Sequence, residues 1–400
     1  MKLHKNLLIG LHTAFSEALA EDKYADKVLE RVLKSNKKWG GRDRSFVSET
    51  FYEIIRWKRN YEYFIGKPLD KDSIYEVILA YLLNNKMEFQ MYDEFHGISV
   101  SKLKDKIKKD FPTKAIKYSI PDWMQTRLEK ELPDRWEKEI RALNVKADPI
   151  LRVNTLKTTK EKLINQLKED HVEVEAINGY KDALRMTFKK NAFRTQAFQD
   201  GLFEMQDASS QKVVEAVDVQ PGMKVIDACA GAGGKTLHLA ARMENKGSII
   251  ALDIFDWKLQ ELKRRARRAG VHTITTRVIE DTKVIKRLAN SADRVLIDAP
   301  CSGLGVLRRN PDAKWKLQEE FIERMIHTQK EILQSYSRMV KVDGILVYVT
   351  CSILPSENEL QVKEFITKNP NFVLLYKENI FPSDSGFDGF FIAKMKKISI

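Results

Sequence analysis

The chain has 400 residues and a mass of 46.3 kDa, enough for two or three domains with hydrophobic cores, which excludes a small disulfide-stapled scaffold. Apolar residues make up 43% and charged residues 31%, mean hydropathy is −0.40, and no apolar run reaches the roughly 18 residues of a membrane span. We expect a soluble protein. Lys and Arg exceed Asp and Glu by 13, which favours binding to a polyanion such as nucleic acid. Many basic proteins are soluble without such a partner, so the charge alone leaves this alternative open.

The N-terminal part predicts a helical bundle over residues 1–145, because apolar positions recur at helical spacing and extended alternation is almost absent. We expect Gly40-Gly41 to end one helix, Gly66-Lys67-Pro68 to end another, and Ser119 to Asp122 to open a further one. A basic run between Lys102 and Lys109 favours a solvated helix face over an RNA contact. The N-terminus shows no targeting signal, so we expect a cytoplasmic protein.

Residues 146–220 predict a small α+β module. Short extended runs at 150–154 and 172–176 flank a helix at 159–169.

From residue 221 to residue 400 strands and helices alternate, which predicts an α/β fold with a parallel sheet and right-handed crossovers. The expected strands are Lys224–Cys229, Ser248–Asp253, Ile274–Ile279, Asp293–Asp298, Ile345–Thr350, and a late pair at Phe372–Leu375 and Phe390–Lys394.

A glycine-rich loop follows the first of these strands, where residues 227–236 read Asp-Ala-Cys-Ala-Gly-Ala-Gly-Gly-Lys-Thr. Glycine lets the backbone turn sharply and approach a ligand closely. The spacing matches neither a phosphate-binding P-loop, which needs Gly at position 229, nor the G-x-G-x-x-G fingerprint, because Thr236 stands at its last position.

Acidic residues stand at the ends of three successive strands. Asp253 lies about 20 residues past the glycine loop, where an α/β nucleotide fold holds ribose hydroxyls, and therefore implies an adenosine-type ligand. Asp281 follows the next strand, and Asp298 closes the strand after that. Each alone reads as a helix cap, Asp281 especially, but the series with the glycine loop favours a ligand site.

The three cysteines are Cys229, Cys301 and Cys351, with no C-x-x-C spacing, which favours a reducing cytoplasm without a disulfide framework or metal site. Cys301 and Cys351 each follow a strand, so we expect both thiols to face one cleft. A thiolate there is suited to adding reversibly to an electron-poor carbon. Cys229 is read more simply as a small core residue.

Three motifs in this order carry a family resemblance: the glycine loop, Asp-Ala-Pro-Cys-Ser-Gly-Leu-Gly-Val-Leu-Arg-Arg-Asn-Pro-Asp from residue 298, and Val-Thr-Cys-Ser-Ile-Leu-Pro-Ser-Glu-Asn-Glu from residue 349. The chain resembles the RNA 5-methylcytosine methyltransferases of the Nop/Sun (NSUN) family, most closely the RsmB branch. The likeness runs from about Leu151 to Phe391. It implies a Rossmann-like S-adenosylmethionine-dependent methyltransferase domain, preceded by a helical NusB-like RNA-binding domain and the small α+β module.

The resemblance also implies roles for residues. S-adenosylmethionine would be held by Asp253 at the ribose, Asp281 near the adenine, Asp298 near the methionine part, and a loop of Cys229, Ala230, Gly231, Ala232, Gly233, Gly234 and Lys235. Cys351 would attack carbon 6 of cytosine, and Cys301 would help to release the methylated product. We further expect Asp298 to hydrogen-bond the cytosine ring edge while the adduct forms. The family commonly has Ala-Pro where this chain has Gly231-Ala232, which leaves the loop less fixed.

RNA contacts are expected at Arg308 and Arg309, just beyond Cys301, and the resemblance adds Arg152. The basic residues between Lys263 and Arg268 are read as a solvated outer helix face. We expect 16S ribosomal RNA as the substrate, with transfer RNA as the alternative, and a monomer without DNA or membrane partners. Two rival interpretations are a non-catalytic RNA-binding assembly factor and a DNA cytosine methyltransferase, which uses a Pro-Cys nucleophile.

Overall fold

The computed structural model describes residues 3–20, 25–187 and 191–399, and the chain divides into two compact units. The first contains the chain up to Lys130 together with a later segment, Asn310–Leu317. The second contains Glu131–Arg309 and Gln318–Ile400. None of the helices in the described ranges is both long enough and apolar enough to cross a bilayer.

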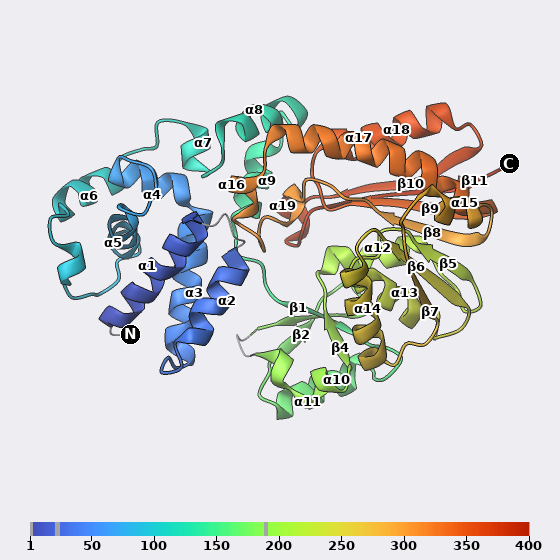
Figure 1. Cartoon of the computed structure of the whole chain (residues 1–400), viewed down its shortest axis with the longest axis horizontal. Helices are drawn as coiled ribbons and strands as arrows, with labels where there is room; N and C mark the ends of the chain where they lie inside the picture. Colours follow the sequence, from blue (N-terminus) through green and yellow to red (C-terminus); the bar gives the residue numbers. More distant parts are fainter. Residues whose placement is uncertain (1–2, 21–24, 188–190, 400) are drawn as a thin grey trace. The chain divides into compact units, whose positions relative to one another are not determined.

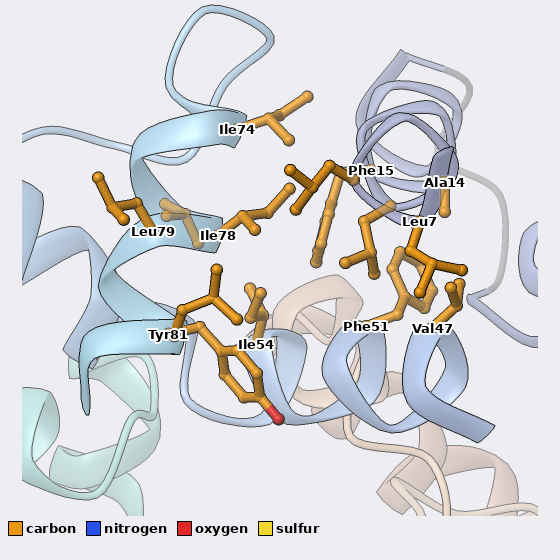
Figure 2. Close-up of a cluster of buried hydrophobic side chains, with 14 of the residues drawn as sticks. Leu7, Ala14, Phe15, Val47, Phe51, Ile54, Ile74, Ile78, Leu79 and Tyr81 are labelled. Carbon is orange, nitrogen blue, oxygen red and sulfur yellow. The ribbon is translucent and has the colours of Figure 1, made fainter. Parts of the chain in front are cut away.

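The first unit is helical. Its elements are α1 Lys5–Ala20, α2 Ala25–Ser35, α3 Gly41–Arg56, α4 Lys58–Ile65, α5 Ile74–Asn84, η1 Asp93–Phe95, α6 Val100–Ile107, α7 Lys114–Lys117, α16 Ala313–Lys316 and most of α8 Asp122–Glu131. Apolar residues three and four positions apart place one face of each long helix against its neighbours. Figure 2 shows the resulting core, in which α1, α3 and α5 contribute Leu7, Ala14, Phe15, Val47, Phe51, Ile54, Ile74, Ile78, Leu79 and Tyr81.

The helix boundaries test the expected turns. Gly66 is the left-handed C-cap of α4, and α8 begins at Asp122, as predicted. The prediction for Gly40-Gly41 is wrong, because Gly40 is the N-cap of α3 and the pair begins a helix. The carboxylate of Asp43 accepts a hydrogen bond from the Gly40 backbone N–H, so the helix start is stabilised by an acidic residue in its first turn.

The segment Asn310–Leu317 satisfies backbone groups at the ends of two helices of the first unit. Lys314 Nζ donates to Arg56 O at 2.7 Å, and Trp315 Nε1 donates to Ile55 O at 2.7 Å, both in the last turn of α3. Asp312 accepts the N–H of Ala25, the first residue of α2. Helix termini leave such groups without intrahelical partners, so the segment completes the helical unit.

The second unit contains a four-stranded antiparallel sheet in the order β2-β3-β1-β4. Leu151 and Val153 of the central strand pack on Leu163 and Leu167 of α10, which gives this small sheet its own core. The elements of this region are α9 Trp136–Leu143, β1 Ile150–Val153, α10 Lys160–Glu169, β2 Val174–Ala176, β3 Ala183–Met186, η2 Ala192–Arg194, α11 Gln196–Gln199 and β4 Phe203–Met205.

A seven-stranded sheet dominates the second unit, in the order β10-β11-β9-β8-β5-β6-β7. Strands β5 to β9 pair in parallel, and β10 and β11 add an antiparallel edge. The strands are β5 Lys224–Asp227, β6 Ser248–Asp253, β7 Ile274–Val278, β8 Ala292–Asp298, β9 Val340–Thr350, β10 Phe372–Ile380 and β11 Phe390–Lys397. All seven expected strands are present, and the last three, β9, β10 and β11, extend further than predicted.

Helices cover both faces of this sheet (Figure 1). Successive strand residues point to opposite faces, so Val225 packs with α12, α13 and α14 while Ile226 packs with α15, α17 and α18. This double layer confirms the predicted Rossmann-like α/β class. The helices are α12 Ala208–Val217, α13 Gly234–Arg242, α14 Asp256–Ala269, α15 Thr282–Arg287, η3 Leu304–Val306, α17 Glu319–Tyr336, η4 Ser337–Met339, η5 Pro355–Glu357, α18 Glu359–Lys368 and α19 Pro382–Ser385.

Candidate active site

The glycine loop joins the end of β5 to the start of α13, at the edge where parallel strands present their carboxyl ends. Gly231 and Gly233 have φ of +54° and +86°, which L side chains rarely adopt. The Gly231 N–H donates to Asp253 Oδ2 at 2.9 Å, and Asp253 Oδ1 accepts the Phe255 N–H at 2.9 Å. The carboxylate at the end of β6 therefore fixes both the loop and the chain that follows β6.

A pocket of about 300 Å³ lies beside this loop. Two carboxylates, Asp253 and Asp298, stand on its wall together with Cys229 and Gly231, and the rest of the lining is mainly apolar: Ala228, Ile254, Phe255, Ile279, Pro300, Ile332 and Tyr336, with Lys258. Carboxylates suit the hydroxyls and amino group of a nucleoside-containing ligand, and apolar walls suit its flat base. The pocket thus fits an adenosine-type ligand. The other predicted loop residues, Ala230, Ala232, Gly233, Gly234 and Lys235, form the rest of the turn into α13.

Two arginines donate hydrogen bonds to backbone carbonyls of the glycine loop. Arg265 Nη1 of α14 donates to Ala232 O at 2.7 Å, and Arg152 Nη1 of β1 donates to Gly234 O at 2.6 Å. Arg152 is buried, donates also to Gln206, and has its pKa lowered to about 10 by that burial. The loop lacks the proline expected from the family pattern, but these two guanidinium groups fix its carbonyls.

The basic stretch of α14 is therefore only partly a solvated face. Arg264 pairs with Glu261 on the surface, whereas Arg265 and Arg268 both pair with the buried carboxylate of Glu204 on β4. Sequence reasoning missed these two residues because their partner lies more than 60 positions away, on a strand of the small sheet.

Lys235 and Asp298 form an ion pair with Nζ and Oδ2 2.6 Å apart. Burial opposes the charge on Lys235, but the Asp298 carboxylate prevails and the pKa of the ammonium is raised. Behind them Asp227 is buried and accepts the Thr236 hydroxyl at 2.7 Å, and its burial raises the carboxyl pKa to about 7. The site therefore holds the Lys235–Asp298 ion pair beside a buried carboxyl group, Asp227, whose pKa is raised toward neutrality.

Asp281 is the N-cap of α15, and its Oδ1 accepts the Lys283 N–H at 2.7 Å. Its side chain is half exposed. This is the cap geometry that the residue type favours. A role at the adenine stays a prediction.

The two thiols expected to share a cleft lie together. Cys301 Sγ and Cys351 Sγ are 3.4 Å apart, on the loops that follow β8 and β9. The hydrogen bond with Cys351, and then burial, raise the pKa of Cys301 well above its ordinary value. Pro300, which precedes Cys301, lines the pocket described above. Burial also raises the pKa of Cys229, which agrees with its interpretation as a core residue.

Close backbone packing fixes the loop that carries Cys351. The Gly305 N–H donates to Cys351 O at 2.9 Å, and the Gly389 N–H donates to Gly305 O at 2.8 Å. A Cβ at Gly305 would overlap Gly389 O and come within 2.8 Å of Cys351 O. These glycines therefore permit a close approach that positions the thiol loop.

Arg308 and Arg309 make intramolecular contacts in this structure. Arg308 is buried and donates to Gly386 O, whereas Arg309 bridges Asp207 at 2.7 Å and Asp388 at 2.6 Å. Burial and the neighbouring Asp207 raise the pKa of Asp388 to about 6, while Arg309 opposes that shift. Like Arg152, these arginines tie together segments distant in sequence, and contact with RNA stays a prediction for all three.

Two family models and several known proteins match this chain. The family model described as 16S rRNA methyltransferase RsmB/F matches residues 214–396, and the model of an RsmF/B-like ferredoxin-like domain matches residues 120–191. The probable ribosomal RNA small subunit methyltransferase B of Bacillus subtilis is 30% identical, with 94% of this chain and 95% of the relative covered. The ribosomal RNA small subunit methyltransferase B of Pectobacterium carotovorum is 34% identical, over 70% of this chain and 67% of the relative.

Two solved structures are similar to this chain over most of its length. The crystal structure of PH0851 has a TM-score of 0.84 and 27% identity, covering 99% of this chain and 100% of that one. A methyltransferase homologue from Pyrococcus horikoshii has a TM-score of 0.63 and 27% identity, covering 71% of this chain and 97% of that one.

Proposed function

Because this chain belongs to the RsmB/F family of ribosomal RNA small subunit methyltransferases, we propose that it methylates carbon 5 of a cytosine in 16S ribosomal RNA. The methyl donor of the family is S-adenosylmethionine. The observation that carries the proposal is the pair of thiols 3.4 Å apart beside a pocket that fits an adenosine-type ligand.

The donor would be held by Asp253, Asp298 and the glycine loop, with Asp253 at the ribose. When bound, S-adenosylmethionine supplies a methyl group made electrophilic by the sulfonium that carries it. The hydrogen bonds from Arg265 and Arg152 restrain the glycine loop before the donor binds, which lowers the entropy cost of binding S-adenosylmethionine.

Cys351 is proposed as the nucleophile. Its thiolate forms a bond to carbon 6 of the cytosine, and the electron pair of the 5,6 double bond then makes carbon 5 nucleophilic. A free cytosine lacks this reactivity at carbon 5, so the covalent adduct is the activating step. The ion pair with Lys235 orients Asp298, so that its carboxylate can accept a hydrogen bond from the ring edge.

Cys301 is proposed to act at release. After methylation a base removes the proton from carbon 5, the 5,6 double bond re-forms, and Cys351 leaves as a thiolate. In the free protein the hydrogen bond to Cys351 contributes most to the raised pKa of Cys301. The Cys301 sulfur lies 3.4 Å from the Cys351 sulfur, close enough to act on a ring to which Cys351 is bonded.

The domain roles are part of the proposal. Residues 1–145 would act as a NusB-like RNA-binding domain, residues 146–220 as a small RNA-binding module, and residues 221–400 as the catalytic domain. A target base must leave its stack to reach two half-buried thiols, so we expect a loop or an accessible helix as the substrate.

The test is incubation of the purified chain with labelled S-adenosylmethionine and 16S ribosomal RNA transcribed in vitro. We expect label at carbon 5 of cytosine, no transfer by Cys351→Ala, and a trapped protein–RNA adduct with Cys301→Ala. Transfer by Cys351→Ala at the wild-type rate would refute the mechanism. Label in transfer RNA alone would change the substrate, and donor binding without transfer would favour a non-catalytic assembly factor.

A further inference from the structure

A buried carboxylate lies beneath both cysteine loops. Glu357, the last residue of η5, is fully buried. It accepts hydrogen bonds from the residue that follows each cysteine: Ser302 after Cys301 and Ser352 after Cys351. Glu357 thus contacts the two thiol-bearing loops through equivalent neighbours.

The two oxygens of the Glu357 carboxylate accept hydrogen bonds from different sets of donors. Oε1 accepts the Ser302 N–H at 2.7 Å, and Oε2 accepts the hydroxyls of Ser302, at 2.5 Å, and of Ser352. The two hydroxyl oxygens lie 3.2 Å apart. Gln329 Nε2 of α17 also donates to Oε1 at 3.1 Å and to Pro300 O at 2.9 Å, which fixes the residue before Cys301. We call Glu357, Ser302, Ser352 and Gln329 the Glu357 network.

The Glu357 network restrains loop residues that lie beyond the hydrogen bonds of the sheet. Cys301 and Cys351 both lie past the ends of their strands, so ladder hydrogen bonds of β8 and β9 do not set the position of either sulfur. A buried carboxyl group is costly unless hydrogen bonds surround it, so the donors around Glu357 are constrained to stay in contact with it. The Glu357 network therefore restrains both loops, in addition to the Gly305 contact that holds the backbone of Cys351.

We propose that Glu357 is a positioning residue that sets the separation of the Cys301 and Cys351 sulfurs, acting through Ser302 and Ser352. The inference rests on the proposed function, because that separation matters only if both thiols act on one cytosine. Two groups acting on one ring need matched placement, and an error of about 1 Å in placement can cost roughly a hundredfold in rate.

Removing the hydroxyl of Ser302 and removing that of Ser352 should change the amount of covalent protein–RNA adduct in opposite directions. Losing the Ser302 hydroxyl loosens the loop of the releasing thiol, so the covalent protein–RNA adduct accumulates. Losing the Ser352 hydroxyl loosens the loop of the nucleophile, so less adduct forms. A purely structural network would lower the amount of folded protein without changing the fraction of active enzyme held as adduct.

The first experiment measures thiol proximity in the full-length chain without RNA or donor. Oxidised glutathione takes two electrons and two protons from Cys301 and Cys351, leaves as two glutathione thiols, and produces a disulfide that peptide mass spectrometry identifies. We expect Glu357→Ala to slow this reaction roughly tenfold. Glu357→Gln keeps an acceptor oxygen and adds donors that serine hydroxyls accept, so it should react like the wild type. Glu364→Gln on α18, which removes only a surface ion-pair partner, is the matched control.

The second experiment measures the adduct fraction and methyl transfer on 16S transcript for Ser302→Ala and Ser352→Ala. We expect a higher adduct fraction than wild type for the first and a lower one for the second. An oxidation rate for Glu357→Ala equal to that of Glu364→Gln would overturn the inference, as would equal adduct fractions in both serine variants. If Glu357→Ala does not fold, the serine variants decide by both assays. A wild-type chain that transfers no methyl group refutes the proposed function but leaves the oxidation result intact.

Discussion

The glycine loop offers three substitutions to alanine that separate backbone strain from steric overlap. Gly234 is the first residue of α13. Among the described residues, no heavy atom lies within 4 Å of the position that a Cβ would occupy there. Gly231 has the same open space but a φ of +54°. Gly233 combines a φ of +86° with a Cβ that would lie 2.5 Å from Leu262 Cγ.

These differences predict a graded loss of stability. Alanine at Gly234 should stabilise the fold by about 0.5 kcal/mol, since it reduces the freedom of the unfolded chain. Alanine at Gly231 should cost about 1 kcal/mol for the left-handed backbone. Alanine at Gly233 should cost about 3 kcal/mol, because overpacking against the buried Leu262 adds roughly 1–3 kcal/mol to the same backbone cost.

The assay is urea unfolding of the three variants and the wild type without S-adenosylmethionine, followed by far-UV circular dichroism. The absence of donor matters because a bound ligand would add its own contribution to the unfolding free energy. If Gly233→Ala proved as stable as Gly234→Ala, the assigned loop conformation and its packing on α14 would be wrong.

Three further predictions concern groups around the site. Arg265→Met removes the hydrogen bond to Ala232 O and should weaken S-adenosylmethionine binding about tenfold by calorimetry, whereas the surface variant Arg264→Met should bind normally; equal affinities would contradict the loop argument. The raised Asp227 pKa means that the folded chain retains a proton which the unfolded chain releases, so unfolding free energy should fall by up to about 1.4 kcal/mol per pH unit between roughly pH 4 and pH 7. Asp227→Asn should remove this decline, so its gain over wild type in urea unfolding should be larger at pH 8 than at pH 5, and a gain independent of pH would contradict the raised pKa. Gly305→Ala should displace the Cys351 loop and lower methyl transfer more than tenfold with unchanged donor affinity, and an active variant would show that the loop tolerates the overlap.

The sequence predicted the site best where its residues lie at the carboxyl ends of strands. The glycine loop and the two thiols follow strands, the carboxylates of Asp253 and Asp298 end β6 and β8, and strand order brings these ends to one edge. Alternating strands and helices likewise predicted the doubly covered sheet.

The sequence could not reveal partners that meet only in the folded chain. Arg152 lies 82 positions from Gly234, and Ser302 lies 55 positions from Glu357. Arg308 and Arg309 were expected to contact RNA because they follow Cys301, and Arg152 because of the family resemblance. In the folded chain each of the three forms hydrogen bonds or ion pairs with distant segments, which the sequence did not reveal. The pair Gly40-Gly41 misled because glycine both ends helices and tolerates the N-cap position that Gly40 occupies.

The helical unit is encoded in two separate stretches of the chain, since Asn310–Leu317 belongs with the residues up to Lys130. A recombinant fragment that stops at Lys130 would leave the carbonyls of Ile55 and Arg56 without the indole and ammonium donors they have here. It would also uncover the apolar surface on which Trp315 packs. Truncation at Lys130 is therefore a poor way to isolate this unit. A fragment that joins residues 310–317 to the first 130 residues through a designed linker would keep the contacts of both stretches.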